Sequence, residues 1–407
     1  MKTNLIQGNI SLRDKIFYYL MTMFIVLILC QGCNSTGIHL EIVTSMPEGT
    51  DLVSRGTRST AEVWVELIKG AEENIDLAEF YLISKKGELL ESVINSLVNA
   101  AKRGVKIRIL SDKKMMGTYP EVVKRLKIIK NIFIRIFNWE KRGMGILHAK
   151  YFIVDDKRAF VGSQNFDWRS LKHIHETGIL VEEPGIVKNL KAIFEADWEF
   201  NGGNLRAYDH KDVEKIVMGK NLFLTASPES LNPRGIKSTI KIIRESVRKA
   251  KKKVTVQLLN YQANRYKSEK KFTELENELK NAGKRGVIVK ILVSDWNLRK
   301  HQIAGIKELA ESPGIEVKVA SIPVHSSGFI PFARVIHSKV MRVDENLCMV
   351  STSNWGYGYF YSSRNVEIFF RSKKHAKILD LLFNDLWDSQ YTFTLDPGKE
   401  YKEPKIN

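Results

Sequence analysis

Residues 147–155 of the sequence read Leu-His-Ala-Lys-Tyr-Phe-Ile-Val-Asp, and residues 336–344 read Ile-His-Ser-Lys-Val-Met-Arg-Val-Asp. Both stretches contain the spacing His-x-Lys-x4-Asp, and each is followed by a turn and a second run that begins with apolar residues and ends with polar ones, at 160–165 and 349–354. Two short apolar runs around a turn are typical of a β-hairpin. A hairpin that recurs with the same polar residues indicates two homologous halves in one chain.

The regions that precede these hairpins repeat an alternation of helix and strand. Apolar periodicity predicts helices at 59–72, 88–103, 236–252 and 272–284, and strands at 75–83, 105–110, 254–261 and 287–293. The sequence Lys-Arg-Gly-Val occurs at both 102–105 and 284–287, and we align Phe80-Tyr81 with Asn260-Tyr261. We therefore predict an α/β fold of two homologous mixed α/β/α sandwich halves that pack on each other as a pseudo-dimer.

Changes in this pattern set the expected boundaries. We expect a signal peptide at 1–33, the first half at 40–205, the second half at 215–395 and a tail at 396–407. Basic residues precede the apolar run 16–30, and Gly32-Cys33 follows it, as at the cleavage and lipidation site of a bacterial lipoprotein. Cys30 stands where that site usually has Leu. The alternative to a cleaved lipoprotein signal is an uncleaved signal anchor. Both predict an exported protein anchored in the membrane of the cell envelope.

Composition narrows the classes of substrate. The formal net charge of +18 favours anionic partners such as nucleic acid or a phospholipid surface. There are three cysteines, and Cys30 and Cys33 belong to the signal region. The remaining Cys348 cannot form a disulfide framework or a cysteine-based zinc site within the exported part.

The histidine and lysine of each motif are the candidate catalytic residues. Side chains alternate along a strand, so His148 and Lys150 share one face, as do His337 and Lys339. Imidazole can attack phosphorus or donate a proton near neutral pH, and an ammonium group can neutralise phosphate oxygens. The motif aspartates point to the other face, so we expect Asp155 and Asp344 to support the site by fixing the end of each strand and its turn.

Other polar residues recur at matching places in the two halves. The returning strands are expected to bring hydroxyl and amide donors to the phosphate, namely Ser163, Asn165, Thr352 and Asn354. Glu176 and Glu367 each lie at an apolar stretch, and a buried carboxylate needs a partner, so we predict that each one orients a catalytic imidazole. Tyr81 and Tyr261 are the candidate substrate-contacting tyrosines.

A metal site is not expected from the sequence. The run His173-Ile174-His175-Glu176 contains possible ligands, but no third convergent ligand is visible, and surface histidines after a turn are the commoner case. We predict no cofactor. A single His-x-Lys pair is usually incidental, whereas recurrence with the same downstream residues indicates function.

The whole set of motifs resembles the phospholipase D superfamily, whose members carry His-x-Lys-x4-Asp, twice in the larger ones. Residues 162–170 and 352–355, with 47–49 and 387–389, look like the branch of lysosomal single-strand exonucleases and poxvirus relatives. The resemblance implies metal-independent hydrolysis or transfer of a phosphodiester through a phosphohistidine, with His148 as nucleophile and His337 as acid. Three alternatives stay open. The roles of the two histidines could be reversed, and the substrate could be phospholipid instead of single-stranded nucleic acid. The chain could also be a catalytically inactive basic envelope protein that binds anionic polymers or membranes.

Overall fold

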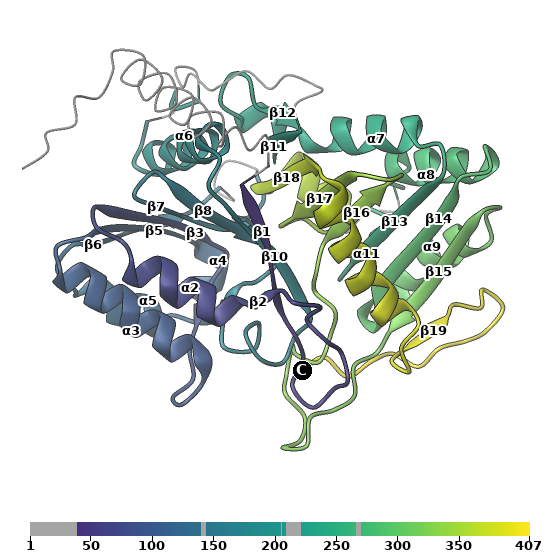
Figure 1. Cartoon of the computed structure of the whole chain (residues 1–407), viewed down its shortest axis with the longest axis horizontal. Coiled ribbons are helices and arrows are strands. Elements are labelled where there is room, and N and C mark those ends of the chain that lie inside the picture. Colours follow the sequence, from purple (N-terminus) through teal and green to yellow (C-terminus); the bar gives the residue numbers. More distant parts are fainter. Residues whose placement is uncertain (1–38, 140–143, 205, 209–220, 266–269) are drawn as a thin grey trace, which may run out of the picture. The chain divides into compact units, whose positions relative to one another are not determined.

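A computed structural model describes residues 39–139, 144–204, 206–208, 221–265 and 270–407, and residues 39–407 form one compact unit (Figure 1). The expected signal peptide with Cys33, and most of the joint between the halves, lie outside the described residues. Among the described helices, none is both long and apolar enough to cross a membrane.

The first half is built on an eight-stranded sheet in the order β2-β1-β10-β8-β7-β3-β5-β6. Helices α2, α3 and α5 pack on one face around buried Trp64, and α6 lies on the other face, where Lys191 bonds Asp76 of β3 at 2.6 Å (Figure 1). The bounds are β1 Leu40–Ser45, β2 Arg58–Ser59, α2 Thr60–Lys69, β3 Asn74–Glu79, α3 Leu89–Lys102, β5 Lys106–Asp112, α4 Lys113–Met116, α5 Glu121–Lys127, β6 Ile132–Phe137, β7 Lys150–Val154, β8 Arg158–Gly162, β10 Glu176–Val181 and α6 Pro184–Asn201. A separate pair joins β4 (Leu82–Ile83) to β9 (Phe166–Asp167).

The second half repeats this plan with a nine-stranded sheet in the order β12-β11-β18-β17-β16-β13-β14-β15-β19. Side chains of α7, α8 and α9 pack with one face of the sheet, and α11 packs on the other. The bounds are β11 Leu222–Ser227, β12 Lys237–Ser238, α7 Thr239–Lys249, β13 Lys253–Leu258, α8 Glu274–Lys284, β14 Ile288–Ser294, α9 Lys300–Ala310, β15 Ile315–Ala320, β16 Val340–Val343, β17 Leu347–Ser351, α10 Tyr357–Tyr361, β18 Asn365–Arg371, α11 Lys373–Trp387 and β19 Thr392–Thr394. Two α/β/α halves are therefore present, as predicted.

Strand register corrects the alignment of the two halves. Ile75 of β3 pairs with Ile107 and Val154, and Val254 of β13 pairs with Val289 and Val343, so residues of β13 differ from their counterparts in β3 by 179 in number. At that offset Tyr261 corresponds to Leu82, and the counterpart of Tyr81 is Asn260. The alignment of Tyr81 with Tyr261 was wrong by one residue because it matched residue types instead of strand register.

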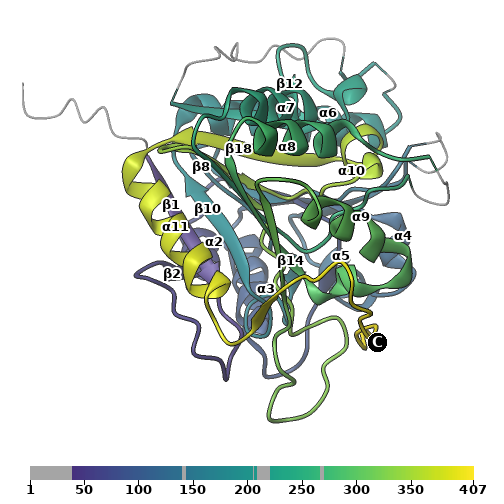
Figure 2. The ribbon, with the colours of Figure 1, turned by 90° about the vertical axis from the view of Figure 1, so that its right-hand side faces the viewer.

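The two sheets meet through their central strands. Strands β8 and β10 lie against β17 and β18, and α11 of the second half runs beside β1 of the first (Figure 2). His375 Nε2 in α11 lies 3.0 Å from the carbonyl oxygen of Leu40. A buried ion pair also joins the halves, because Arg364 Nη2 lies 2.9 Å from Asp197 Oδ1 and both side chains are fully buried. Since breaking a buried pair leaves an uncompensated charge, this contact ties α6 of the first half to the residue before β18 of the second.

Candidate active site

The motif histidines lie just before β7 and β16, where each half contacts the other. The backbone N–H of His148 donates to the carbonyl oxygen of Arg364 at 2.9 Å, and that of His337 donates to the carbonyl oxygen of His175 at 2.8 Å. Arg364 and His175 directly precede β18 and β10. The motif histidine of each half is therefore held by a backbone carbonyl of the other half. These contacts bring both motifs into one site.

The two imidazoles are oriented by different groups across this interface. His337 Nδ1 lies 2.8 and 3.0 Å from the carboxylate oxygens of Glu176. His148 Nδ1 lies 3.0 Å from Oδ1 of Asn365. The orienting contact predicted for Glu176 is present, and it reaches the histidine of the opposite half. One imidazole thus faces a carboxylate, whereas the other faces a neutral amide.

The predicted orienting role of Glu367 was wrong. In the described part of the chain its carboxylate bonds hydroxyl groups, at 3.3 Å from Thr225 and 3.2 Å from Ser351 and more closely from Thr239, and it reaches no histidine. The spacing after each motif histidine identifies the residue that takes this place in the second half. Glu176 follows His148 by 28 residues, and Asn365 follows His337 by 28 residues. Asn365 is the counterpart of Glu176, although it is a different residue type.

The buried Glu367 gives the fold a testable pH dependence. Burial raises its pKa to about 7, although the surrounding hydroxyl groups oppose the shift. The folded state therefore keeps a proton that the unfolded state, with a pKa of about 4.3, releases. This contribution to stability is complete below the unfolded pKa and is lost as pH rises through the folded pKa. We expect the melting temperature of the parent to fall from about pH 5 to about pH 8 relative to that of Glu367→Gln. Parallel melting curves for the two proteins across this range would contradict the assignment.

The hydroxyl groups of Ser163 and Thr352 support the orienting residues instead of facing the substrate. Ser163 Oγ donates to the Glu176 carboxylate, and Thr352 Oγ1 donates to Asn365 Oδ1 at 3.2 Å. Both side chains are completely buried. The prediction that they bind the phosphate is therefore corrected, because their donors are already used and shielded. They are positioning residues that fix Glu176 and Asn365.

The predicted asparagines lie at the ends of the returning strands, with different contacts. Asn165 is buried, and its Oδ1 has no hydrogen-bond partner among the described residues. Asn354 Oδ1 accepts from the backbone N–H of Asn260 at 3.2 Å, and Asn354 Nδ2 donates to the hydroxyl of Tyr359 at 3.3 Å. Asn165 keeps unused hydrogen-bonding capacity for a ligand, whereas Asn354 organises the wall of the site.

Both motif lysines are fully buried, and each has at least one carboxylate near it. Burial lowers the pKa of Lys150 to about 7, although the carboxylates of Glu79, Glu176 and Asp112 oppose the shift. Burial also lowers the pKa of Lys339 well below its usual value, with Glu176 opposing and the charge of Lys150 adding to it. A phosphate between two such amines would restore their protonation, because an anion in a buried site favours the charged form. The sequence analysis did not single out Glu79, whose charge acts on Lys150 and whose buried Oε2 has no hydrogen-bond partner among the described residues.

The motif aspartates fix the strand ends, as expected. Asp155 Oδ1 accepts from the backbone N–H groups of Glu73 and Asn74 at 2.8 and 3.0 Å, and Asp155 itself has a φ of +53°. Asp344 has a φ of +52° and accepts in the same way from the N–H groups of residues 251–253. An acidic side chain tolerates this left-handed conformation and satisfies backbone donors that would otherwise stay unpaired.

Aromatic rings from both halves lie beside His148. The ring centroids of Phe80 and Tyr359 lie 5.3 and 4.9 Å from that of His148. Tyr81 stands beside Phe80, and its hydroxyl donates to Asp167 at 3.0 Å. Tyr261 is only 1% exposed and belongs to the hydrophobic core of the second half, and its contact with substrate stays a prediction that this burial does not favour. Phe80 directly precedes the candidate Tyr81 in the sequence, so it could have been proposed as a site residue. Its counterpart in the second half, at the corrected register, is the aliphatic Leu259.

Comparison with known proteins agrees with this arrangement of two motifs in two halves. A family model described as cardiolipin synthase, PLD-like domain, matches residues 64–198 and 242–387, one segment in each half. The chain belongs to the phospholipase D superfamily. It is 28% identical to the 5'-3' exonuclease PLD3 of Homo sapiens, over 88% of this chain and 81% of the relative. It is also 28% identical to Phospholipase D Z of Dictyostelium discoideum, over 88% of this chain and 92% of that protein.

Solved structures share the duplicated phospholipase D fold with this chain. Phosphatidylserine synthase of Haemophilus influenzae Rd KW20 superposes with a TM-score of 0.63 at 12% identity, over 88% of this chain and 87% of the other. Polyphosphate kinase of Porphyromonas gingivalis gives a TM-score of 0.55 at 13% identity, over 90% of this chain and 50% of the other. At these identities the likeness concerns the fold alone.

Proposed function

We propose that this member of the phospholipase D superfamily hydrolyses phosphodiesters of single-stranded nucleic acid through a phosphohistidine intermediate. The observation that carries the proposal is the convergence of two histidine-lysine pairs whose imidazoles face unlike partners, Glu176 and Asn365. A displacement on phosphorus needs one neutral imidazole and one protonated imidazole at the same time. Two imidazoles in different surroundings can hold these two protonation states together more readily than two imidazoles in identical surroundings.

The contacts favour His148 as the nucleophile. Burial lowers the pKa of His148 well below its usual value, and the charges of Lys150 and Lys339 add to this shift. When its Nδ1–H donates to Asn365 Oδ1, the lone pair of Nε2 is left for phosphorus. Attack by Nε2 forms the N–P bond, and the bond from phosphorus to the leaving oxygen breaks with its electron pair on that oxygen.

The same reasoning favours His337 as the general acid. Burial lowers the pKa of His337, but the Glu176 carboxylate opposes that shift and favours the imidazolium. His337 then gives its proton to the leaving oxygen. In the second step neutral His337 takes a proton from water, the water oxygen bonds phosphorus, and the N–P bond to His148 breaks. An alcohol in place of water would give transfer instead of hydrolysis.

Three observations support nucleic acid as the substrate. Phe80 and Tyr359 offer half-buried rings beside His148, and aromatic rings stack on bases of any sequence. The net charge of +18 favours a polyanion. A relative over most of the chain is named an exonuclease. Because His148 and His337 are only 6% and 8% exposed, an extended single strand suits the site better than a duplex.

Phospholipid is the second candidate substrate. The expected membrane anchor would place the enzyme at a lipid surface outside the cytoplasm. Phe329 and Phe332, in the loop before the second motif, are 38% and 40% exposed, which suits contact with acyl chains. Phospholipase D Z is a relative over most of the chain.

A direct comparison of substrates tests the proposed function. The purified protein is incubated in EDTA with a single-stranded oligonucleotide, the matching duplex and phosphatidylglycerol vesicles, with ethanol added to detect transfer. We expect shortening of the single strand to exceed the other reactions, and to persist in EDTA because no step uses a metal. Cleavage of phosphatidylglycerol alone would move the assignment to phospholipid. Binding of these polymers without turnover on any of them would support the inactive envelope protein.

A further inference from the structure

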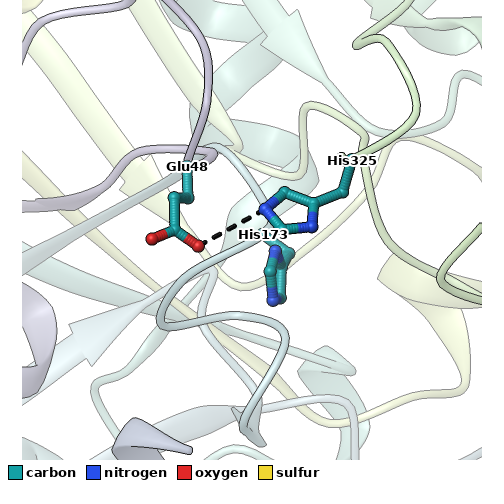
Figure 3. Close-up of side chains that lie close together, drawn as sticks. All are labelled: Glu48, His173 and His325. Atoms are coloured by element: carbon teal, nitrogen blue, oxygen red, sulfur yellow. Dashed lines mark ion pairs between the residues drawn. The ribbon is translucent and has the colours of Figure 1, made fainter. Parts of the chain in front are cut away.

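Three possible metal ligands converge outside the catalytic pair. Glu48, His173 and His325 each offer one donor atom, and these atoms lie within 4.8 Å of one another (Figure 3). They come from three separate segments: the loop after β1, the turn after β9 and the long loop between β15 and β16. The sequence analysis noted only the histidine run at 173–175. Glu48 and His325 each lie more than a hundred residues away from it along the chain, in other loops.

One of the spacings between the donor atoms matches that around a tetrahedral ion, and all three atoms lie within 4.8 Å of one another. Oxygen and nitrogen ligands at about 2.0–2.2 Å from one tetrahedral centre lie about 3.3–3.6 Å from each other. His325 Nε2 is 3.4 Å from Glu48 Oε2, the contact drawn as a dashed line in Figure 3. The His173 ring lies against that of His325, with ring centroids 4.9 Å apart. Two imidazoles and one carboxylate leave a fourth position for water.

Hydrogen bonds of Arg334 hold the three segments together. Arg334 Nη1 donates to the carbonyl oxygen of Glu48 at 2.7 Å, and Arg334 Nε donates to that of Pro323 at 2.7 Å. The backbone N–H of Arg334 donates to the carbonyl oxygen of His173 at 3.1 Å. One arginine thus ties together all three ligand-bearing segments. A site assembled in this way is preorganised for its ligand.

A second observation points to a missing ligand. His173 is 3% exposed, and its Nδ1 is buried with no hydrogen-bond partner among the described residues. Native structures rarely leave such an atom unsatisfied. Glu48 is half exposed and gives an ion a path from solvent.

Neighbouring groups either support or oppose an ion here. His325 Nδ1 lies 2.8 Å from Ser327 Oγ, a contact that orients the ring with Nε2 toward Glu48. Lys172 Nζ lies 3.3 Å from Glu48 Oε2 and competes for the same carboxylate oxygen. Removal of the Lys172 ammonium should therefore strengthen binding of a cation.

We propose that Glu48, His173 and His325 bind one Zn²⁺ ion, which fastens the loop between β15 and β16 to the first half of the chain. The fastened loop leads into His337, and His173 lies close to the His175 carbonyl and Glu176 that hold this histidine. The ion would stabilise the cross-half contacts of the active site without touching substrate. This inference does not depend on the proposed activity, because binding and stability test it directly.

Zinc titration of the purified full chain provides the test. The protein is stripped with EDTA, dialysed, and titrated with ZnCl2 by calorimetry, with melting temperature followed in parallel. We expect one equivalent to bind and the melting temperature to rise. Binding should weaken at least ~10-fold in His173→Ala and in His325→Ala. It should strengthen in Lys172→Ala, an increase that misfolding cannot produce. Co²⁺ should give the strong visible bands of a tetrahedral site.

Two variants separate this site from other histidines. His301 is exposed on α9, so His301→Ala should bind Zn²⁺ like the parent. His148→Ala should also keep the ion, because the catalytic imidazoles are not its ligands. The inference is overturned if the parent binds no stoichiometric Zn²⁺, if His173→Ala and His325→Ala bind like the parent, or if His148→Ala alone abolishes binding.

Discussion

His148→Ala is expected to lose at least ~10³-fold in kcat on every phosphodiester, whatever its leaving group. His337→Ala is expected to lose as much on an oligonucleotide, but far less in the first step on a p-nitrophenyl phosphodiester. The reason is chemical: p-nitrophenolate departs without a proton, so the first step no longer needs the acid, whereas nothing replaces the nucleophile.

Burst kinetics with the two classes of ester measure this difference. His301→Ala is the matched control, since it removes an exposed imidazole far from the motifs in sequence and should keep the rate of the parent. A p-nitrophenolate burst in His148→Ala, with none in His337→Ala, would reverse the two roles. Rates like the parent's in both variants would exclude the site altogether.

Exchanging the partners of the two histidines should shift the pH profile in opposite directions. Glu176→Gln removes the carboxylate that stabilises the His337 imidazolium, so the pKa of this acid falls. Activity requires the protonated form, so the basic limb of kcat/KM should move to lower pH, with a loss of about 10²–10⁴-fold in kcat. Asn365→Asp places a carboxylate against His148 and raises its pKa. Activity requires neutral His148, so the acidic limb should move to higher pH.

Full pH profiles of kcat/KM, recorded with one oligonucleotide, check both directions. Glu367→Gln is the control, because it changes a buried glutamate two residues from Asn365 that contacts only hydroxyl groups among the side chains described around it. The account fails if Glu176→Gln leaves the basic limb in place, or if Glu367→Gln moves either limb as far as the other two variants do.

Much of the fold was predictable because it depends on local and repeated patterns. Apolar periodicity located the helices α2, α3, α7 and α8 and the strands β3, β5, β13 and β14, and the recurrence of His-x-Lys-x4-Asp indicated two halves. Strand alternation also placed Asp155 and Asp344 at the turns, where they accept backbone hydrogen bonds. These features require only the geometry of one strand and its turn.

The errors arose where residue type was used in place of register. Glu367 was chosen because it is a glutamate like Glu176, although the spacing of 28 residues after the motif histidine leads to Asn365. Tyr261 was matched to Tyr81 for the same reason. The crossing of the orienting groups between halves was not predictable, because it depends on how two sheets meet. The convergence of Glu48, His173 and His325 depends in the same way on long loops that have no periodicity.

The most direct test of the central claim is to trap the covalent intermediate. His337→Ala should react with a p-nitrophenyl ester of thymidine monophosphate but lack the base that activates water for the second step. We predict that mass spectrometry after digestion at neutral pH finds the nucleotidyl group on His148. An adduct on another residue of His337→Ala, or an adduct on His337 in His148→Ala, would contradict the account.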